Sequence, residues 1–288
     1  MTKTIWISLL LCAWNLCAQN TPLEKITSRD GLSQSMVFDL IQTRDGFLWF
    51  GTKDGLNRYD GHQFIAFKHD PFDSTSISGD IIFSLYEDSQ NRIWAGTESR
   101  GINIFRRETL SFQRIQSADD GFNLSDNTVM CIAEDPSGGI WAGTTWGYLI
   151  RIESAANGAL RVSRVFLSTD SSRVETKALK MLSDGRLIAA GTGGAFSVDW
   201  KTGKSVPIPL KSLKEGGTLS AIYEDSLHRI WIGGSNSLAL LDGKQTRYFD
   251  LPAGAGAVNS FAADQNGHVW VSAYDFAFRM TTDGDPEA

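Results

Sequence analysis

Hydrophobic positions along the chain fall into short runs of about five to eight residues, and none of these runs follows the 3.6-residue spacing of an amphipathic helix. The runs are rich in β-branched and aromatic residues. Asp-Gly, Asn-Gly or other polar pairs separate them, as hairpin turns require. The pattern therefore predicts an all-β chain built from consecutive hairpins.

One unit recurs along the chain: an apolar strand, a polar turn, a second strand with an early Trp, and a further turn. Five copies carry the Trp, and a degenerate fourth copy has Ile or Ala there. The copies centre on Trp49, Trp94, Trp141, Ile188, Trp231 and Trp270. A period near 45 residues is typical of a β-propeller blade. We therefore predict a β-propeller of about six four-stranded blades, with strands A to D running outward from the axis.

Three further columns appear when the copies are aligned on the marker. A glycine two positions later is expected where strand B ends in a tight turn or another backbone approaches closely; it is Gly51, Gly96, Gly143, Gly191 or Gly233. Strand A contains a column of short side chains, expected where inner strands crowd the axis: Asp39, Ser84, Cys131, Ala178, Ala221 and Ser260. The next column is apolar and predicts an inter-blade core: Leu40, Leu85, Ile132, Leu179, Ile222 and Phe261.

The closure of the ring has two interpretations. The sixth copy has little sequence left for a fourth strand, and residues 23–27 precede the first copy at the right distance to supply one. The chain is then a complete six-bladed ring, closed as propellers close. Alternatively, it is the beginning of a seven-bladed ring, which the abrupt end of the sixth copy slightly favours.

Composition and charge narrow the function classes. Of 288 residues, 21% are charged and 42% are hydrophobic, as in a globular chain with a long core. The formal net charge is −6 and the pI is near 5.3. A nucleic-acid-binding domain would carry a basic patch or a high pI, so we expect no nucleic-acid partner.

The N-terminus has the features of a secretion signal. Lys3 precedes an apolar stretch over residues 5–16, which is too short to span a bilayer. Leu16-Cys17-Ala18 fits a signal-peptidase site. We predict a signal peptide over residues 1–18 and a propeller over residues 19–288, periplasmic or extracellular and without a membrane span.

The cysteines agree with cleavage rather than lipidation. A lipoprotein signal is disfavoured because Leu precedes both Cys12 and Cys17. After cleavage only Cys131 remains, so no internal disulfide can form, and we expect this thiol in the core.

The candidate catalytic groups do not converge. His228 and His268 fall in A–B turns, whereas His62 and His69 fall near strand D, so neither a metal site nor a catalytic base is predicted, and no cofactor is expected. The segments from Asp88 to Trp94, Asp135 to Trp141 and Asp225 to Trp231 resemble the Asp-box of sialidases. We interpret each Asp as the cap of its own turn.

The best binding candidates follow strand B, in the B–C loops. In a propeller these loops gather with the D–A loops around one mouth of the channel. The predicted ligand-binding residues are Lys53, Arg100, Trp146, Asn236 and Tyr274. Trp146 lies outside the marker column and could stack on a sugar ring, although packing on a neighbouring loop is the more frequent role of such a residue.

A family resemblance rests on the first copy. The stretch DGLSQSMVFDLIQTRDGFLWFGTKDGLNRYDGHQF, from Asp30 to Phe64, resembles the opening of the two-component regulator propeller family. The resemblance extends over about residues 23–280 and is weakest in the fourth copy. It implies the sensor region of a hybrid histidine kinase or one-component regulator, of a kind common in Bacteroidetes.

The resemblance also implies functions beyond this chain. It implies a longer parent receptor with a membrane helix and cytoplasmic signalling domains, which forms a homodimer and binds oligosaccharides. The 288 residues contain no kinase motif, so we expect a non-catalytic sensor for glycans or other small polar ligands. Two alternatives stay open: a metal-dependent propeller lyase resembling streptogramin lyases, and a structural or adhesive propeller.

Overall fold

The computed structural model describes residues 25–119, 121–124, 128–155, 157–167, 175–210, 217–235, 237–243, 245–252, 254–274, 276–280 and 286–287. The described residues form six four-stranded antiparallel sheets in a ring, with one short 3-10 helix, η1 (Ser28–Asp30). The predicted six-bladed propeller is confirmed. The predicted signal peptide, residues 1–18, lies outside the described residues.

Each blade is a meander in which sequence order equals spatial order. Blade 1 contains β1 (Val37–Gln42), β2 (Leu48–Thr52), β3 (Gly55–Tyr59) and β4 (Phe64–Phe67). Blade 2 contains β5 (Ile82–Glu87), β6 (Ile93–Thr97), β7 (Ile102–Arg106) and β8 (Ser111–Ile115). Blade 3 contains β9 (Val129–Glu134), β10 (Ile140–Thr144), β11 (Tyr148–Ser154) and β12 (Leu160–Phe166).

The second half of the ring repeats this arrangement. Blade 4 contains β13 (Thr176–Met181), β14 (Leu187–Gly191), β15 (Gly194–Val198) and β16 (Ser205–Ile208). Blade 5 contains β17 (Leu219–Glu224), β18 (Ile230–Gly234), β19 (Ser237–Asp242) and β20 (Gln245–Asp250). Blade 6 contains β21 (Val258–Ala263), β22 (Val269–Ala273), β23 (Phe276–Met280) and β24 (Pro286–Glu287).

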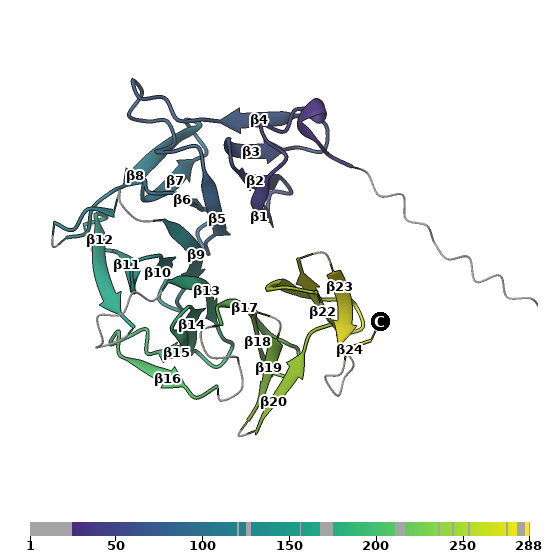
Figure 1. Cartoon of the computed structure of the whole chain (residues 1–288). Helices are drawn as coiled ribbons and strands as arrows, with labels where there is room; N and C mark the ends of the chain where they lie inside the picture. Colours follow the sequence, from purple (N-terminus) through teal and green to yellow (C-terminus); the bar gives the residue numbers. More distant parts are fainter. Residues whose placement is uncertain are drawn as a thin grey trace, which may run out of the picture.

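The first strand of every blade lies innermost, and the blades follow one another around the ring (Figure 1). Consecutive inner strands lie side by side from β1 to β5 and onward to β21. The last blade does not pack against the first in this way, and an opening separates them in Figure 1. Among the residues that the structure describes, five interfaces therefore join the six blades.

Five hydrophobic clusters correspond to these five interfaces. In each, the marker residue of one blade packs against the following blade: Trp49 lies with Ile82 and Leu85 of blade 2, and Trp231 lies with Val258 of blade 6. Trp49, Trp94, Trp141 and Trp231 are fully buried. The expected wedge role of the marker Trp is confirmed at these four positions.

The strand register confirms Ile188 as the marker of the fourth copy. It also shows that the predicted glycine of this copy, Gly191, was assigned to the wrong column. Ala178 pairs with Ala190, as Cys131 pairs with Gly143, so Ala190 and not Gly191 stands in the glycine column. Gly191 lies one position later. A Cβ there would come within 1.6 Å of the Glu175 carbonyl oxygen, which explains why this position is also glycine.

Close approach of the next blade, rather than a turn, explains the glycine column. A Cβ on Gly96 would lie 2.6 Å from a methyl carbon of Val129, and one on Gly143 would lie 2.8 Å from a methyl carbon of Thr176. Neither glycine has a positive φ. The missing side chain lets the first residue of the following inner strand lie over strand B.

The short side chains of strand A also serve the interface, and not only the crowding around the axis. The Ser84 hydroxyl donates to the Val129 carbonyl at 3.1 Å, and Asp39 accepts from the Leu85 N–H at 2.7 Å. Both partners belong to the following blade. A short polar side chain reaches the neighbouring backbone here, which a bulky one could not do.

The expectation about the fourth strand of blade 6 is wrong. Blade 6 has its own fourth strand, β24, paired with Arg279 and Met280 of β23. Residues 25–27 belong to no strand. The few residues after Met280 suffice because the outer strand needs only two residues of pairing. No helix within the described residues has the length and hydrophobicity of a membrane span.

Candidate functional site

The loops on one face of the ring are held together by a hydrogen bond that repeats in all six blades. A backbone N–H of the B–C loop donates to the carbonyl of the residue just before the inner strand. The donor and acceptor pairs are Lys53 and Met36, Glu98 and Ile81, Thr145 and Thr128, Thr192 and Glu175, Ser235 and Thr218, and Tyr274 and Ala257. The B–C and D–A loops therefore share one face, as expected; we call it the loop face.

The predicted ligand-binding residues lie on this face but come from separate blades. Lys53, Arg100, Trp146 and Tyr274 are exposed and belong to blades 1, 2, 3 and 6. None of the four described pockets is lined by any of them. Asn236 lies outside the described residues. The structure thus places four of these residues on one face without gathering them in a described pocket.

A second set of residues at the channel was missed by sequence reasoning. The second residue of every inner strand is a β-bulge, where the register shifts by one residue. Bulges often re-aim a side chain beside a functional site. The bulge residues are Phe38, Phe83, Met130, Lys177, Ser220 and Asn259, and none is buried. In the sequence, each bulge residue stands one position before the short residue of strand A, and this position was the only signal that could have identified it.

The bulge residues differ in chemistry from blade to blade. The rings of Phe38 and Phe83 lie 4.5 Å apart, centroid to centroid, and both remain partly exposed. In blade 4, Lys177 forms an ion pair of 3.2 Å with Glu175, and in blade 6 the amide of Asn259 is exposed. Exposed aromatic faces, charged groups and amides are the side chains that polar ligands with apolar patches, such as sugars, require.

The opposite face carries the Asp–Trp units, and their role is structural. Asp88 accepts from the backbone N–H groups of Gln90 and Arg92 at 3.0 and 2.8 Å, and from the indole N–H of Trp94 at 2.7 Å. Asp135, Asp225 and Asp264 bond their own Trp side chains in the same way. The prediction that each Asp caps its own turn is confirmed.

Blade 1 and blade 4 depart from this unit in opposite ways. Thr43 stands at the Asp position of blade 1, and the buried indole N–H of Trp49 has no hydrogen-bond partner among the described residues. In blade 4 both positions are apolar: Leu182 and Ile188 are buried in one cluster. Blade 4 therefore loses donor and acceptor together, whereas blade 1 keeps an unpaired donor.

Glutamates at the ends of inner strands tie neighbouring turns together on the same face. Glu134 accepts from the backbone N–H and hydroxyl of Ser89 in the preceding blade, at 2.8 and 2.6 Å. Glu224 accepts from Ser183, and Glu87 accepts from the Arg44 N–H, in the same manner. These carboxylates serve blade-to-blade contacts rather than chemistry.

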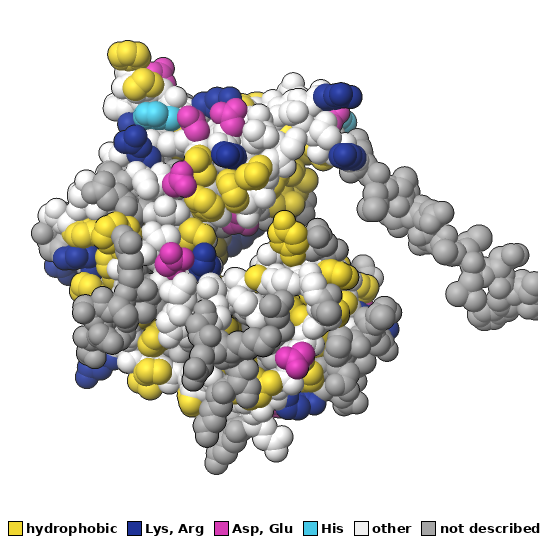
Figure 2. Space-filling view, in the orientation of Figure 1, with side chains coloured by type: hydrophobic (Ala, Val, Ile, Leu, Met, Phe, Trp, Pro, Cys, Tyr) yellow, Lys and Arg dark blue, Asp and Glu magenta, His cyan; other side chains and the backbone are white. Residues whose placement is uncertain are grey.

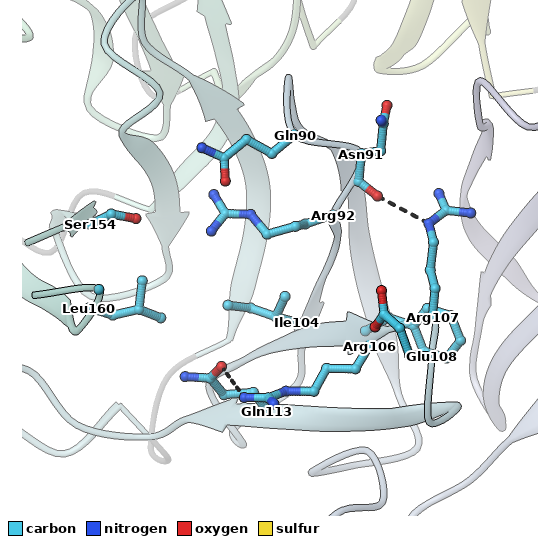
Figure 3. Close-up of a pocket in the computed structure, with 12 residues that line it drawn as sticks. Gln90, Asn91, Arg92, Ile104, Arg106, Arg107, Glu108, Gln113, Ser154 and Leu160 are labelled. Atoms are coloured by element: carbon cyan, nitrogen blue, oxygen red, sulfur yellow. Dashed lines mark hydrogen bonds between the residues drawn. The ribbon is translucent and has the colours of Figure 1, made fainter.

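A pocket of about 540 Å³ lies between blades 2 and 3, beside the A–B turn of blade 2 (Figure 3). Three arginines line it, and two of them form ion pairs: Arg92 pairs with Asp88 at 2.5 Å, and Arg107 pairs with Asp45 and Glu87. Arg106 donates to the side-chain oxygen of Gln113 at 2.9 Å. This open, polar pocket is a second place for a polar ligand.

The titratable side chains fit structural roles. Burial raises the pKa of the Cys131 thiol, so the thiol stays protonated at neutral pH and is a poor nucleophile. Burial also raises the pKa of Asp39, although two backbone N–H groups donate to it. His228 contacts Ser183 and Glu224, and His268 contacts Asp264. Within the described parts of the chain, no three His, Cys, Asp or Glu side chains form a metal-binding group.

Comparison with known proteins agrees with this architecture. The family model described as two component regulator propeller matches residues 31–54, 76–99 and 123–146, which are the starts of blades 1 to 3. Histidine kinase P4 of Formosa agariphila is 52% identical over 68 residues, which cover 23% of this chain and 5% of that protein.

Two solved structures are similar to this chain in fold. The extracellular domain of the hybrid two component system BT3049 from B. thetaiotaomicron has a TM-score of 0.76 and 25% identity, and the match covers 92% of this chain and 36% of that one. A streptogramin B lyase has a TM-score of 0.67 and 17% identity, and the match covers 88% of this chain and 83% of that one. The lyase likeness shows a shared fold alone.

The chain spans about a third of the length of the BT3049 domain and a small part of the kinase. The marker column and the blade order agree with the matched repeats, because each matched segment contains the marker Trp of its blade. Three of the six blades match the two component regulator propeller repeat, and the fold is similar to that of the BT3049 extracellular domain.

Proposed function

We propose that this propeller is the extracytoplasmic sensor part of a two-component-type signalling protein. The observation that supports it most is the coincidence of the regulator propeller repeat with a fold like that of the BT3049 extracellular domain. In this proposal the propeller binds a ligand outside the cytoplasm, and any kinase activity belongs to a longer parent receptor, within which two copies associate.

The proposed ligand is an oligosaccharide or another small polar molecule bound at the loop face. Trp146 is 46% exposed and offers an aromatic surface, and Phe38 with Phe83 offers a second one at the channel. Arg100 and Lys53 offer donors for hydroxyl or carboxylate groups. Exposed aromatic surfaces and polar groups on the same face support the proposal of sugar binding there.

Titration calorimetry with a panel of neutral and acidic oligosaccharides tests the proposal. A binder should lose at least tenfold in affinity in Trp146→Ala or Phe38→Ala. Phe166→Ala is the matched control, because Phe166 is an exposed aromatic residue (58%) on the outer strand β12. Binding that all three variants keep would show that the loop face is not the site.

Export is proposed with a cleaved signal peptide over residues 1–18. Expression with the natural N-terminus in a Gram-negative host, followed by N-terminal sequencing of the periplasmic protein, tests this. A mature protein that begins at Gln19 is expected. Retention of Met1 in a cytoplasmic product would contradict it.

A propeller lyase is the second candidate function, because a streptogramin B lyase has the same fold at 17% identity. Turnover of a streptogramin B antibiotic, measured with added Mg²⁺ and again with EDTA, separates the two functions. Metal-dependent ring opening would establish the lyase. Saturable sugar binding without turnover would support the sensor.

A further inference from the structure

In each blade the residue just before strand B lies opposite a residue at the end of strand C, and the strand register identifies both. One step beyond the Leu187–Val198 pair of blade 4, Arg186 stands opposite Asp199. The strand C residue at this position is acidic in blades 1, 3, 4 and 5: Asp60, Glu153, Asp199 and Asp242. An acidic side chain is therefore the ordinary occupant of this position.

Blade 2 has an arginine at this position. One step beyond the Ile93–Phe105 pair, the same register sets Arg92 opposite Arg106. Like charges directly opposite each other on two strands destabilise a sheet. The protein as a whole is acidic, with a formal net charge of −6, and Figure 2 shows its Lys and Arg side chains spread over several blades. The two facing arginines of blade 2 are thus a local departure from the repeat, of a kind that a bound anion would stabilise.

Both guanidinium groups line the pocket between blades 2 and 3. Figure 3 shows them pointing toward the side of Ser154 and Leu160 of blade 3, with Ile104 between them. Ile104 is buried, and Leu160 packs against the same core cluster, so the two arginines lie on either side of an apolar surface. The volume of about 540 Å³ lies in the range of small-molecule sites.

The two arginines keep hydrogen-bond donors for a ligand. Arg92 uses its Nε, which donates to Asp88 at 2.5 Å. Arg106 uses one terminal nitrogen, which donates to the Gln113 side-chain oxygen at 2.9 Å. Among the described residues, Asp88 is the only carboxylate paired with either arginine, and it also accepts from Trp94. The remaining guanidinium N–H groups can therefore bind the oxygens of a carboxylate or a sulfate.

The other charged residues of the lining do not neutralise Arg106. Arg107 donates from all three of its nitrogen atoms, to the Asn91 carbonyl and to two carboxylates, so its role is structural. Glu108 is the only acidic residue among the described lining residues. It is exposed and lies on the Arg107 side of the pocket in Figure 3. Within the part of the chain that the structure describes, Arg106 thus has no carboxylate partner.

We propose that this pocket binds the carboxylate or sulfate group of an acidic sugar, held between Arg92 and Arg106. The oxyanion takes the place that an Asp or Glu side chain holds in four other blades, and the sugar ring lies against Ile104 and Leu160. The proposal rests on the proposed function in one respect, that the ligand is a saccharide. It adds the charge of that saccharide and a site away from the loop face.

Titration calorimetry with two matched pairs of probes tests the proposal: digalacturonic acid against digalactose, and a sulfated galactose against galactose. At low salt each acidic probe is expected to bind about tenfold more tightly than its neutral counterpart, or better. Arg106→Asp should remove this preference, because it returns to blade 2 the acidic side chain of the other blades. Arg29→Asp, which makes the same change of charge on the exposed helix η1, should leave it unchanged.

The stability of the variants provides a second readout. Arg106→Asp replaces a repulsive pair by an attractive one, so its urea midpoint should exceed that of Arg106→Gln, which should exceed that of the wild type. Digalacturonic acid should raise the midpoint of the wild type but not that of Arg106→Asp. A variant that loses binding because it misfolds would instead have a lowered midpoint.

The outcomes separate this proposal from the loop-face site. An acid preference that depends on Arg106 and persists in Trp146→Ala supports the pocket, even if no neutral probe binds. Equal affinity for acidic and neutral probes, a preference that persists in Arg106→Asp, or no binding of either acidic probe would overturn it. Neutral binding that Trp146→Ala weakens would still support the sensor in those cases. Inorganic sulfate that binds as tightly as the sulfated galactose would overturn sugar recognition, since the pocket would then hold an anion alone.

Discussion

At the scale of single residues, the Asp–Trp unit shows that a buried Trp at the marker position depends on a hydrogen-bond acceptor for its indole N–H. A buried indole N–H without an acceptor loses its bond to water and gains nothing in return, at a cost of about 1–3 kcal/mol. Three buried marker Trp residues have an Asp acceptor six residues earlier, and blade 4 dispenses with both partners. Trp49 is the exception, with Thr43 in the acceptor position.

The exception leads to a stabilising substitution, Thr43→Asp. The new carboxylate should accept from the Trp49 indole, and it would also lie near Arg58, whose guanidinium lies 6.0 Å from the Trp49 ring. We expect a gain of about 1 kcal/mol and a rise in Tm of about 2–4 °C, measured by calorimetry. Thr43→Val is the control, without an acceptor. A Tm for Thr43→Asp at or below that of the control would refute this explanation.

The same unit predicts a dependence of stability on pH. Burial pushes the pKa of Asp225 upward, but hydrogen bonds from Trp231 and Arg229 outweigh it and hold the pKa below its ordinary value of 3.8. The folded state therefore gains stability from this carboxylate above about pH 4, and loses it as the pH falls through the lowered pKa.

We therefore expect Asp225→Ala to cost about 2 kcal/mol at pH 7 and clearly less near pH 2, from urea midpoints at both values. Asp250→Ala, an exposed position on β20, is the control and should have little effect at either pH. An Asp225→Ala deficit that stays constant across the pH range would show that the carboxylate charge is not responsible.

At the scale of elements, periodicity in the sequence predicted the blades and their register, because each strand repeats a buried face. Alignment on the marker placed Leu40 and Leu85 in one column, and the structure confirms the equivalence. The bulge residues such as Phe38 escaped prediction because a bulge changes the direction of a side chain without requiring a particular residue type. Gly191 was misplaced because Ala190 stands in the glycine column of blade 4, and the next position requires glycine for a different reason, the close approach of the Glu175 carbonyl.

The candidate site was less predictable than the fold for a related reason. Residues such as Trp146 and Tyr274 could be placed on the loop face, since loops after strand B must emerge there. Their distances across the channel depend on blade tilt and loop conformation, which no repeat pattern encodes. The β24 strand was missed because two paired residues leave no hydrophobic alternation to detect.

Two equivalent marker residues differ in burial, since Trp231 is fully buried and Trp270 is 41% exposed, so we expect unequal effects when each is replaced. Trp231→Ala should cost about 3–5 kcal/mol, because it empties a closed interface, whereas Trp270→Ala should cost about 1 kcal/mol or less. Urea unfolding of both variants measures the difference. Trp146→Ala, which alters an exposed Trp in a loop, is the control. Equal losses at Trp231 and Trp270 would mean that the blade 6 face is covered in solution.

At the scale of the whole molecule, the five interfaces form a linear series in which the first and last blades have one partner each. Stability in such arrays is roughly a sum of unit and nearest-neighbour terms, so the ends open first. Amide hydrogen exchange should therefore be fastest in β1 and in β22 and β23, and slowest in β9, β10 and β13. Uniform protection across the six blades would contradict an open ring.

The direction of the Trp contacts also bears on how such a chain can change in length. Every blade packs its marker residue against the following blade and its inner strand against the preceding one. A duplicated whole repeat therefore meets both neighbours with complementary faces wherever it is inserted. A duplicated half repeat would place two like faces together. Growth and loss by complete units is thus the route that preserves packing, and a permuted chain cut between any two blades should retain every remaining interface.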